Sequence, residues 1–374
     1  MMESFAAVSL AGAVPAVSVI VPAYMVADFI GEALDSVLEQ SFDDFEIIVV
    51  DDGAPDGEEI ARVVGERRDH RIRYIRQENR GLAGARNTGM LAARGALIAL
   101  LDGDDWWEPD FLAEQVAFLA NNPDVHLVYA DAWIEGDPLA IGRTYMQFYP
   151  SVGDVTLHSL LVGQCSVIPS AVVARRDTMI AAGMFDDKLR VAEDLDMWLR
   201  LAKQGTRMAY QCKPLIRRRV HANNLGSDMV RMLATVTQVL DKHSSDIALS
   251  PIERGALKMA QLRVRSELAL AHGKRSLAQR DFAAAVTELK MIDRAYRNWK
   301  IPLAVLSLSV CPRAVYLAYI LRERIEGVRL SHVARRARLV GARPDSGLPE
   351  AVPVQPYPKP TKPTTPIGAD ERDL

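Results

Sequence analysis

Cysteine is scarce in this sequence, which holds only Cys165, Cys212 and Cys311 among 374 residues. An odd number of widely spaced cysteines supports neither a disulfide framework nor a CxxC metal site, and a reduced, cytoplasmic compartment is the expected location. An excess of one charge is also missing, since 45 Lys and Arg residues face 48 Asp and Glu residues. The net charge of -3 gives no reason to expect a nucleic acid as partner.

The sequence has no uninterrupted apolar run long enough to cross a bilayer. A spanning helix needs about 20 such residues, and the best candidate, 301–321, contains Pro302, Pro312 and Arg313. The N-terminal segment has an acidic residue and no basic cluster, so we do not expect a secretory signal there. What remains is a composition typical of a globular protein, with 49% hydrophobic and 25% charged residues.

Residues 17–220 alternate short β-branched runs with amphipathic segments. This alternation predicts an α/β fold with an open, mostly parallel sheet that carries helices on both faces. We expect strands at 17–21, 45–50, 71–76, 96–101 and 125–130.

Four parts are expected along the chain: an N-terminal extension (1–16), the α/β domain (17–226), a helical C-terminal region (227–343) and a proline-rich, disordered tail (344–374). Within the helical region, the pattern of 262–296 predicts two helices joined near His272 and Gly273. Such a pair cannot form a repeat array by itself, so we expect it to pack on the α/β domain, with a partner-binding repeat as the alternative.

Two acidic clusters directly follow predicted strands: Asp51-Asp52-Gly53 and Asp102-Gly103-Asp104-Asp105. Ligands bind at the carboxyl ends of strands in open α/β sheets, so both clusters are expected at one ligand-binding edge. The spacing of Asp102 and Asp104 lets two carboxylates converge on Mg²⁺ or Mn²⁺ and leaves coordination positions for a diphosphate. No Walker loop or dinucleotide fingerprint is present, which disfavours a P-loop kinase and a nicotinamide enzyme.

These motifs resemble those of the family 2 inverting glycosyltransferases, which have the Rossmann-like GT-A fold. The matching stretches are VSVIVPAY at 17–24, VVDDGAPDG at 49–57, NRGLAGARNTGMLAARGALIALLDGDDWWEPDFL at 79–112, GMFDDKLRVAEDLDMWLRLA at 183–202 and RRVHANNLG at 218–226. The sequence departs from the family at Ala54, where a Ser is usual, and it lacks the QxxRW motif of processive synthases. The resemblance therefore implies the addition of a single sugar.

The resemblance also implies which residues contact the nucleotide: Pro22, Ala23, Tyr24, Asp51, Asp52, Arg86 and Asn87. The first three would line the nucleoside pocket. Asp51 or Asp52 would accept a hydrogen bond from N3–H of uracil or thymine, a donor that cytosine lacks. Arg86 and Asn87 would lie beside the nucleotide, unless they are only polar residues of a helix surface.

At the diphosphate, Asp102 and Asp104 match the family's metal and ribose-diphosphate motif, whereas Asp105 is expected only to support the loop. His221 falls in an R-x-H-x-x-N pattern whose His reaches the metal or the diphosphate, and Arg219 would neutralise diphosphate charge. The implied cofactor is Mn²⁺ or Mg²⁺.

Asp194 matches the catalytic base of the family, because inversion needs one base on the acceptor hydroxyl. It lies at a predicted helix start, whose free N–H groups are expected to keep the carboxylate charged at neutral pH. Glu193 would either orient the acceptor or cap the helix, and both roles stay open. Trp198 is expected in the core rather than as a sugar platform.

The implied function is metal-dependent transfer of one sugar from a nucleotide diphosphate sugar, of UDP or dTDP type, to a carbohydrate or lipid-linked acceptor, as in cell-surface polysaccharide or glycan assembly. One alternative is a nucleotidyltransferase that makes nucleotide sugars, although 22–31 lacks the Gly-rich, basic loop that would grip a triphosphate. The other is an inactive scaffold acting through 228–343, although all of Asp102, Asp104 and Asp194 are present.

Residues 301–343 combine apolar and basic character. Between Arg313 and Arg343, eight arginines face Glu323 and Glu326, a local excess of +6 in a chain that is acidic overall. Apolar residues precede this stretch, so we expect a peripheral membrane contact at the cytoplasmic face. The alternative is a helix that packs on the catalytic domain and has a solvated basic end.

Overall fold

The computed structural model describes residues 14–137, 140–221, 224, 228–244, 249–292 and 300–322. The expected proline-rich tail lies outside these residues, as does most of the expected N-terminal extension. Both therefore stay predictions.

One eight-stranded sheet forms the centre of the molecule, in the order β3-β2-β1-β4-β7-β6-β8-β5. The strands are β1 (Val17–Ala23), β2 (Phe45–Asp51), β3 (Ile72–Arg76), β4 (Leu97–Leu100), β5 (Trp106–Trp107), β6 (Leu127–Glu135), β7 (Val172–Arg175) and β8 (Met208–Arg219). Strands β1 to β4 pair in parallel, whereas β7 runs antiparallel to β4 and β6. The expected open α/β sheet is confirmed, and the insertion of β7 makes it mixed.

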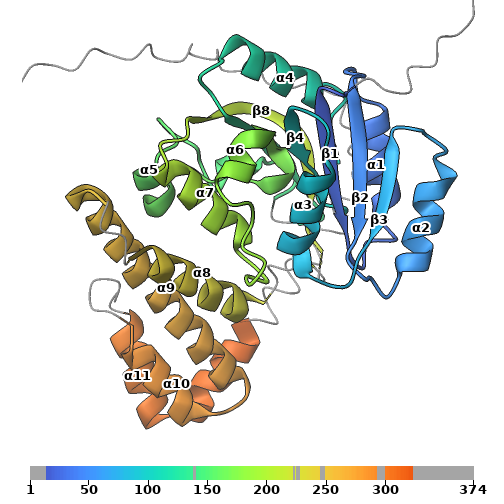
Figure 1. The fold of residues 1–374 in the computed structure, drawn as a ribbon. Helices are drawn as coiled ribbons and strands as arrows, with labels where there is room; N and C mark the ends of the chain where they lie inside the picture. Colours follow the sequence, from blue (N-terminus) through green and yellow to red (C-terminus); the bar gives the residue numbers. More distant parts are fainter. Residues whose placement is uncertain are drawn as a thin grey trace, which may run out of the picture.

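The helices are α1 (Ile30–Leu38), α2 (Gly57–Glu66), α3 (Gly81–Ala92), α4 (Phe111–Asn121), α5 (Leu157–Val162), α6 (Arg176–Ala181), α7 (Glu193–Lys203), α8 (Met229–Ser244), α9 (Pro251–Ala278), α10 (Phe282–Lys290) and α11 (Lys300–Val310). Helices α1 and α2 lie on one face of the sheet and α3 on the other (Figure 1). Right-handed crossovers require this arrangement, because the chain moves outward from β1 to β3 and then returns to β4. The carboxyl ends of β1, β2 and β4 consequently meet at one edge.

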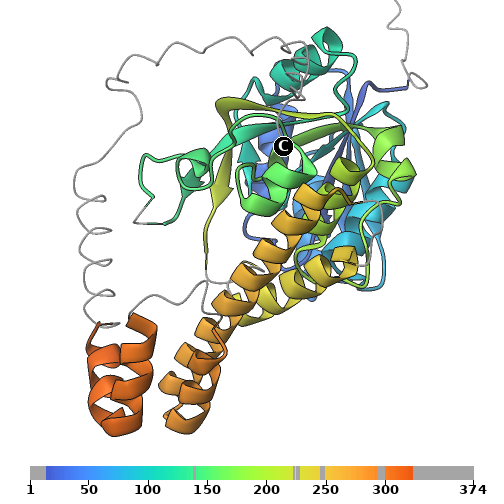
Figure 2. The same cartoon turned by 90° about the vertical axis from the view of Figure 1, so that its left-hand side faces the viewer.

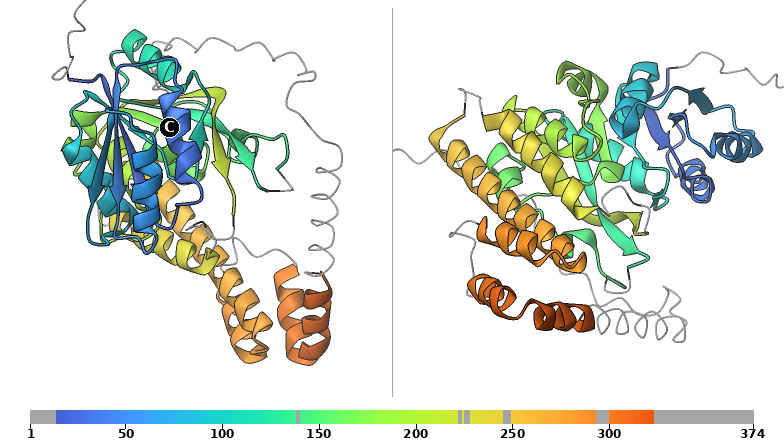
Figure 3. Two further views of the ribbon diagram at one scale, coloured as in Figure 1. Left: turned by 90° about the vertical axis from the view of Figure 1, so that its right-hand side faces the viewer. Right: turned by 90° about the horizontal axis from the view of Figure 1, so that it is seen from below.

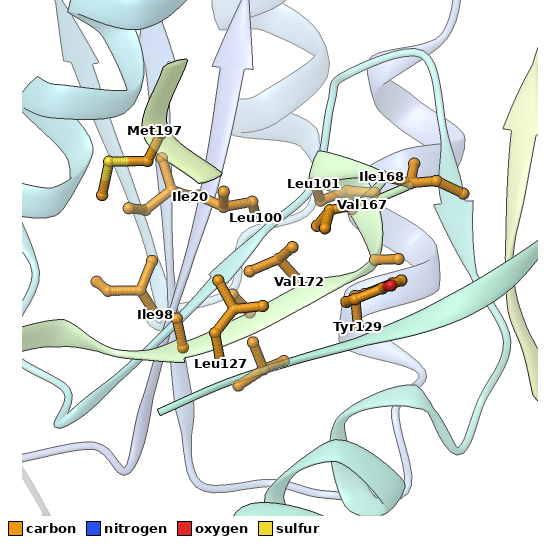
Figure 4. Close-up of a cluster of buried hydrophobic side chains, with 14 of the residues drawn as sticks. Ile20, Ile98, Leu100, Leu101, Leu127, Tyr129, Val167, Ile168, Val172 and Met197 are labelled. Atoms are coloured by element: carbon orange, nitrogen blue, oxygen red, sulfur yellow. The ribbon is translucent and has the colours of Figure 1, made fainter. Parts of the chain in front are cut away.

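The core lies where neighbouring strands and α7 meet (Figure 4). Ile20 of β1, Leu100 of β4, Leu127 of β6 and Met197 of α7 are each at most 1% exposed. Full burial of such a side chain contributes about 1.5–3 kcal/mol to folding. Met197 therefore anchors α7, and with it Glu193 and Asp194, to the sheet.

The helices after β8 extend away from the sheet, with α11 at the far end (Figures 1 and 2). Helix α9 packs on α5 and α8 packs on α7. The apolar core of the sheet continues through these helices to Val264, and a second cluster begins at Ala269. The division into domains at 226/227 stays a prediction, and the buried core crosses it.

The helical region differs from the sequence expectation at His272 and Gly273. Helix α9 runs without a break from Pro251 to Ala278, so the predicted join at these two residues is wrong. The chain turns instead at Arg280, which has a φ of 63°. Gly273 has a packing role: a Cβ there would lie 3.2 Å from Leu289, so the glycine allows α10 to approach α9 closely.

In the part of the chain that the structure describes, no helix is both long and apolar enough to cross a membrane. Helix α11 and the helical residues 312–322 instead form the end of the helical region (Figure 3).

Candidate active site

The acidic loop after β4 is held in place by Asp105. Its Oδ1 accepts a hydrogen bond from the backbone N–H of Arg219 (2.9 Å), and its Oδ2 accepts one from the Ser170 hydroxyl (2.7 Å). The Ser170 Oγ also accepts from the N–H of Asp102 at 3.2 Å. Burial, together with the charges of Asp104 and Asp102, raises the pKa of Asp105 to about 8. Asp105 therefore supports the loop that presents Asp102 and Asp104.

Asp104 lies against the segment that follows β8. Its Oδ2 is 3.0 Å from Nε2 of His221, and it accepts a hydrogen bond from the side-chain amide of Asn224, also at 3.0 Å. The imidazole ring of His221 stacks on Phe29, with ring centroids 4.9 Å apart. Burial and the charge of Asp102 raise the pKa of Asp104, while His221 opposes the shift.

Asp102, Asp104 and His221 were the residues expected to bind a metal. The described residues contain no group of three His, Cys, Asp or Glu side chains arranged as a complete cation site. Asp104 and His221 nevertheless place a carboxylate oxygen beside an imidazole nitrogen, a donor set that suits Mn²⁺ and is compatible with Mg²⁺. These residues fit a divalent ion that takes further ligands from phosphate oxygens and water, as such ions commonly do.

Arg86 joins the acidic loop to the start of α7. Its guanidinium, on a side chain that is 1% exposed, donates to Oδ1 of Asp102 (2.6 Å) and to Oε1 of Glu193 (2.7 Å). It also lies over the ring of Phe185, at 5.3 Å. A buried cation requires such partners. Arg86 thus brings together two acidic motifs that are far apart in the sequence.

The start of α7 has an unusual backbone conformation. Ala192, just before the helix, has a φ of 57°, a left-handed conformation that non-glycine residues rarely adopt. It is followed by Glu193, which is 4% exposed, and by Asp194, which is partly exposed. Burial raises the pKa of Glu193 to about 7, with Asp194 and Asp102 adding to the shift and Arg86 opposing it.

Asp194 was expected to be held as an anion by the helix start. The N–H of Leu195 does donate to its carboxylate at 2.8 Å, and Arg86 also lowers the pKa. Burial and the charge of Asp102 outweigh these effects, and the net shift of the Asp194 pKa is upward. The helix start therefore acts on Asp194 in the expected sense, but burial and the neighbouring acid have the larger effect on its pKa.

The predicted nucleoside residues lie at the end of β1. Pro22 and Ala23 are buried within the sheet, whereas Tyr24 is 45% exposed. The turn after them is fixed by Asp56, whose two carboxylate oxygens accept from the N–H groups of Met25 and Ala27, each at 3.0 Å. Sequence reasoning did not single out Asp56, although it belongs to the DDGAPDG stretch.

Asp51 and Asp52 have extensive protein partners. Asp51 accepts hydrogen bonds from the N–H of Ala54 (2.9 Å) and the hydroxyl of Tyr74 (2.6 Å). Asp52 accepts from three donors: the N–H groups of Arg80 (2.8 Å) and Gly81 (2.7 Å) and the amide of Gln77 (2.7 Å). Asp52 therefore secures the start of α3, and both side chains are at most 2% exposed.

Asn87 follows Arg86 on α3 and is bonded to protein backbone. Its amide donates to the carbonyl oxygen of Phe185 (2.8 Å) and accepts from the N–H of the same residue (2.9 Å). Trp198 is 2% exposed and packs edge-on against the ring of Phe185, as expected of a core residue.

Asp196 is a further buried acid that sequence reasoning did not identify. It lies on α7 and is fully buried. It accepts from Arg200 (2.8 Å) on the same helix and contacts Lys242 (2.9 Å) and His243 (3.3 Å) on α8. Burial opposes ionisation, but these hydrogen bonds outweigh it and lower the Asp196 pKa. The network ties α8 to the helix that carries Asp194.

Arg219 connects the acidic loop to α1. Its Nε donates to the backbone carbonyl of Asp104 at 3.0 Å, and its guanidinium pairs with Glu32. The same guanidinium lies over the rings of Trp106 and Phe29. Taken together, the structure gathers five predicted residues, Asp102, Asp104, Asp194, Arg219 and His221, around one edge of the sheet.

Comparison with known proteins gives a match between residues 18–167 and the model of the family described as glycosyl transferase family 2. The putative teichuronic acid biosynthesis glycosyltransferase TuaG of Bacillus subtilis is 31% identical over 51% of this chain and 73% of that protein. The uncharacterized glycosyltransferase RP339 of Rickettsia prowazekii is 29% identical over 66% of this chain and 83% of that protein. A match at 54% identity to the uncharacterized glycosyltransferase EpsJ of Bacillus subtilis spans only 27% of that protein.

Two solved structures share the fold. Residues 1–349 of Staphylococcus aureus TarS, in complex with UDP-GlcNAc, align with a TM-score of 0.56 at 17% identity, covering 75% of this chain and 91% of that one. The mannosyltransferase PcManGT of Pyrobaculum calidifontis, in complex with GDP-Man and Mn²⁺, aligns with a TM-score of 0.56 at 22% identity, covering 88% and 89%. These likenesses establish a common GT-A architecture.

Proposed function

This chain belongs to glycosyl transferase family 2, and from that premise we propose that it transfers one sugar from a nucleotide diphosphate sugar to a carbohydrate or lipid-linked acceptor, with inversion at the anomeric carbon. Membership of this family favours glycosyl transfer over the synthesis of nucleotide sugars. Assembly of a cell-surface polysaccharide or glycan is the proposed setting.

The observation that carries this proposal is the bridge made by Arg86. It holds Asp102, on the acidic loop, close to Glu193 and hence to the neighbouring Asp194. A transferase needs a negatively charged leaving group and a base for the incoming hydroxyl on opposite sides of one carbon atom. The acidic loop supplies residues beside the leaving group, and the motif at the start of α7 supplies the base.

Asp194 is the proposed base. It takes the proton of the acceptor hydroxyl as that oxygen forms a bond to the anomeric carbon. The bond from this carbon to the diphosphate oxygen breaks at the same time, and its electron pair leaves with the nucleoside diphosphate. The partial exposure of Asp194 is compatible with the approach of an acceptor to this residue.

The donor diphosphate is proposed to lie beside Asp102, Asp104, Arg219 and His221. A divalent ion, Mn²⁺ or Mg²⁺, held by Asp104 and His221 with Asp102 nearby, would supply a Lewis acid that stabilises negative charge on the leaving group. The chain's own residues orient this end of the site: Asp105 fixes the loop, and Arg219 brings a positive charge to it.

The proposed donor is of UDP or dTDP type. Tyr24 offers an exposed ring at the end of β1 for the base, next to the buried Pro22 and Ala23. Asp51 already accepts two hydrogen bonds and lies 3.5 Å from Nε of Arg76, and Asp52 accepts three hydrogen bonds. A carboxylate has about four lone-pair positions, so either acid retains capacity for the N3–H of a pyrimidine.

We also propose that the enzyme works at the cytoplasmic face of a membrane, with α11 and the helical residues 312–322 against an anionic lipid surface. Five apolar side chains of these helices are 51–75% exposed: Leu303, Leu306, Val310, Leu317 and Leu321. The charged residues of 300–322 are all basic: Lys300, Arg313 and Arg322. Exposed apolar residues with only positive charge beside them suit shallow insertion among anionic headgroups.

Release of nucleoside diphosphate across a panel of nucleotide sugars, with Mn²⁺ or Mg²⁺, tests the proposed function. Release that depends on both a particular donor and an added glycan acceptor supports glycosyl transfer. A protein that binds and turns over no nucleotide sugar would contradict it.

A further inference from the structure

The segment between β6 and α5 places a group of aromatic and basic side chains beside the site. Phe148 is 39% and Tyr149 is 56% exposed. The ring of Tyr149 lies 4.8 Å from that of Tyr145, and the guanidinium of Arg143 lies over Phe148 at 3.9 Å. Tyr145 is half-buried against the core and so anchors the segment, while Phe148 and Tyr149 present exposed rings that are available to a ligand.

Two contacts connect this group to the acidic site. The hydroxyl of Tyr145 is 3.1 Å from Oγ of Ser166, which lies four residues before the Ser170 that holds the acidic loop. The guanidinium of Arg218, on β8, lies 5.8 Å from the ring of Tyr145. Its neighbour Arg219 contacts the acidic loop directly. The aromatic group is thus attached to the site from two sides.

Side chains alternate along a strand, so Arg218 and Arg219 point to opposite faces of β8. Arg219 points toward α1, where it pairs with Glu32. Arg218 points to the other face, toward Tyr145. Tyr145 and Arg218 therefore lie on the face of β8 opposite to Arg219, and Arg219 is on the side of the proposed diphosphate.

In-line inversion requires the acceptor to approach from the side opposite the leaving group. Arg218 and the neighbouring Tyr145 lie on the face of β8 opposite to Arg219, so an acceptor bound there would approach from the required side. We propose that Tyr149 and Phe148 stack on a sugar ring of the acceptor, and that Arg143 and Arg218 face a negative charge on that acceptor. This subsite rests on the proposed transferase function and specifies its acceptor as an anionic glycan.

The two guanidinium groups of this subsite lie over aromatic rings, and neither is neutralised by a carboxylate of the described residues. Among the described residues, no carboxylate lies within ion-pair distance of Arg143 or Arg218, whereas Arg217 on the same strand pairs with Glu108 and Glu135. A guanidinium with no carboxylate partner is suited to bind phosphate or carboxylate, often through two parallel hydrogen bonds. Phosphate and carboxylate groups can both accept these hydrogen bonds, and the probes of the experiment distinguish between them.

The experiment measures binding of three probes to the full-length chain loaded with UDP and Mn²⁺: glucose 1-phosphate, glucuronic acid and methyl glucoside. The variants are Arg218→Gln and the double variant Phe148→Ala/Tyr149→Ala. Ile141→Ala, an exposed residue of the same segment, and Arg254→Gln on α9 serve as controls. Binding of UDP itself is measured for every variant.

We expect one or both anionic probes to bind at least 10-fold more tightly than the neutral glucoside. Arg218→Gln should remove this preference, and Phe148→Ala/Tyr149→Ala should weaken all three probes about equally. The controls should leave probe binding unchanged, and every variant should bind UDP as the wild type does. Preference for the phosphate or for the carboxylate identifies the anion.

Equal binding of charged and neutral probes, or no binding of any of them, would overturn the subsite. Unchanged anion preference in Arg218→Gln would do so as well. These outcomes leave UDP binding and donor turnover intact, whereas failure of the proposed function removes nucleotide binding from the wild-type chain.

Discussion

The guanidinium of Arg86 lies 2.6 Å from Oδ1 of Asp102, and its other amino group holds Glu193. One fully buried cation thus determines the separation between the acidic loop and the start of α7. Both flanking carboxylates depend on it for neutralisation.

Arg86→Gln should therefore destabilise the fold strongly. Removal of one partner from a buried ion pair costs about 3–5 kcal/mol, and Glu193, whose side chain is 5% exposed, would stay buried without its cation. Chemical denaturation measures the free energy of unfolding. Arg62→Gln is the matched control, since Arg62 pairs with Glu59 and Glu66 on the surface, and such pairs contribute about 0–1 kcal/mol. Similar losses in the two variants would show that the Arg86 bridge is not structurally important.

Glu193 should make stability fall as the pH rises. Its pKa in the folded chain is raised to about 7 from an ordinary value of 4.5. Between these values the folded state binds more protons than the unfolded state, so the free energy of unfolding decreases with pH, by about 3 kcal/mol in total from this group.

Glu193→Gln removes this contribution, so the variant should lose less stability than the wild type between pH 5 and pH 8. Melting temperatures across this range measure the difference. Glu78→Gln, at an exposed position, is the control. Parallel wild-type and Glu193→Gln profiles would mean that Glu193 titrates normally.

Asp104→Ala should abolish metal-dependent donor binding and leave the fold intact, because a loop carboxylate contributes little to packing. Calorimetry with a nucleotide sugar should show tight binding by the wild type with Mn²⁺ and weak binding with a chelator. The variant should bind weakly under both conditions. Full turnover in excess EDTA would contradict the proposed role of Asp104 and His221 in holding a cation.

Leu303→Ser/Leu306→Ser/Val310→Ser should weaken binding to vesicles rich in phosphatidylserine. These side chains are 51–75% exposed, so the change should leave folding nearly unaffected. Binding by the wild type should also fall with added salt, since each basic residue near the surface contributes about 1 kcal/mol. Sedimentation measures the bound fraction, and Ile252→Ser, 71% exposed on α9, is the control. Equal sedimentation of the triple variant and the wild type would exclude this surface as the membrane contact. Self-association of the wild type that depends on concentration and is lost in the triple variant would instead show that the surface binds a second copy of the chain.

The sequence predicts those parts of the fold that depend on local pattern. The β-branched runs predict the strands β1, β2 and β4. The position of the acids that follow these strands could be predicted as well, because the carboxyl ends of parallel strands lie at the same edge of a sheet. The course of α9 could not be predicted, because the effect of Gly273 depends on Leu289 of α10. A glycine in a helical pattern signals a break or a close contact equally well.

The contacts that hold the site residues in place could not be predicted from the sequence for the same reason. A loop-supporting role for Asp105 could be predicted from the sequence, but its partners, Ser170 and the backbone of Arg219, could not. Likewise, nothing in the pattern around Asp196 indicates that α8 supplies its partners. Sequence motifs identify the residues that contact ligands. The residues that hold those ligand-binding residues in place are identified only by contacts between distant parts of the chain.

The most direct test of the account is the turnover of Asp194→Asn. The substitution keeps the size of the side chain and much of its hydrogen bonding, but an amide cannot take the acceptor proton. We predict a loss of about 10²–10⁴-fold in kcat, the usual contribution of a general base, with donor affinity and melting temperature near those of the wild type. A variant that transfers sugar at a near wild-type rate would contradict the account and show that another group is the base.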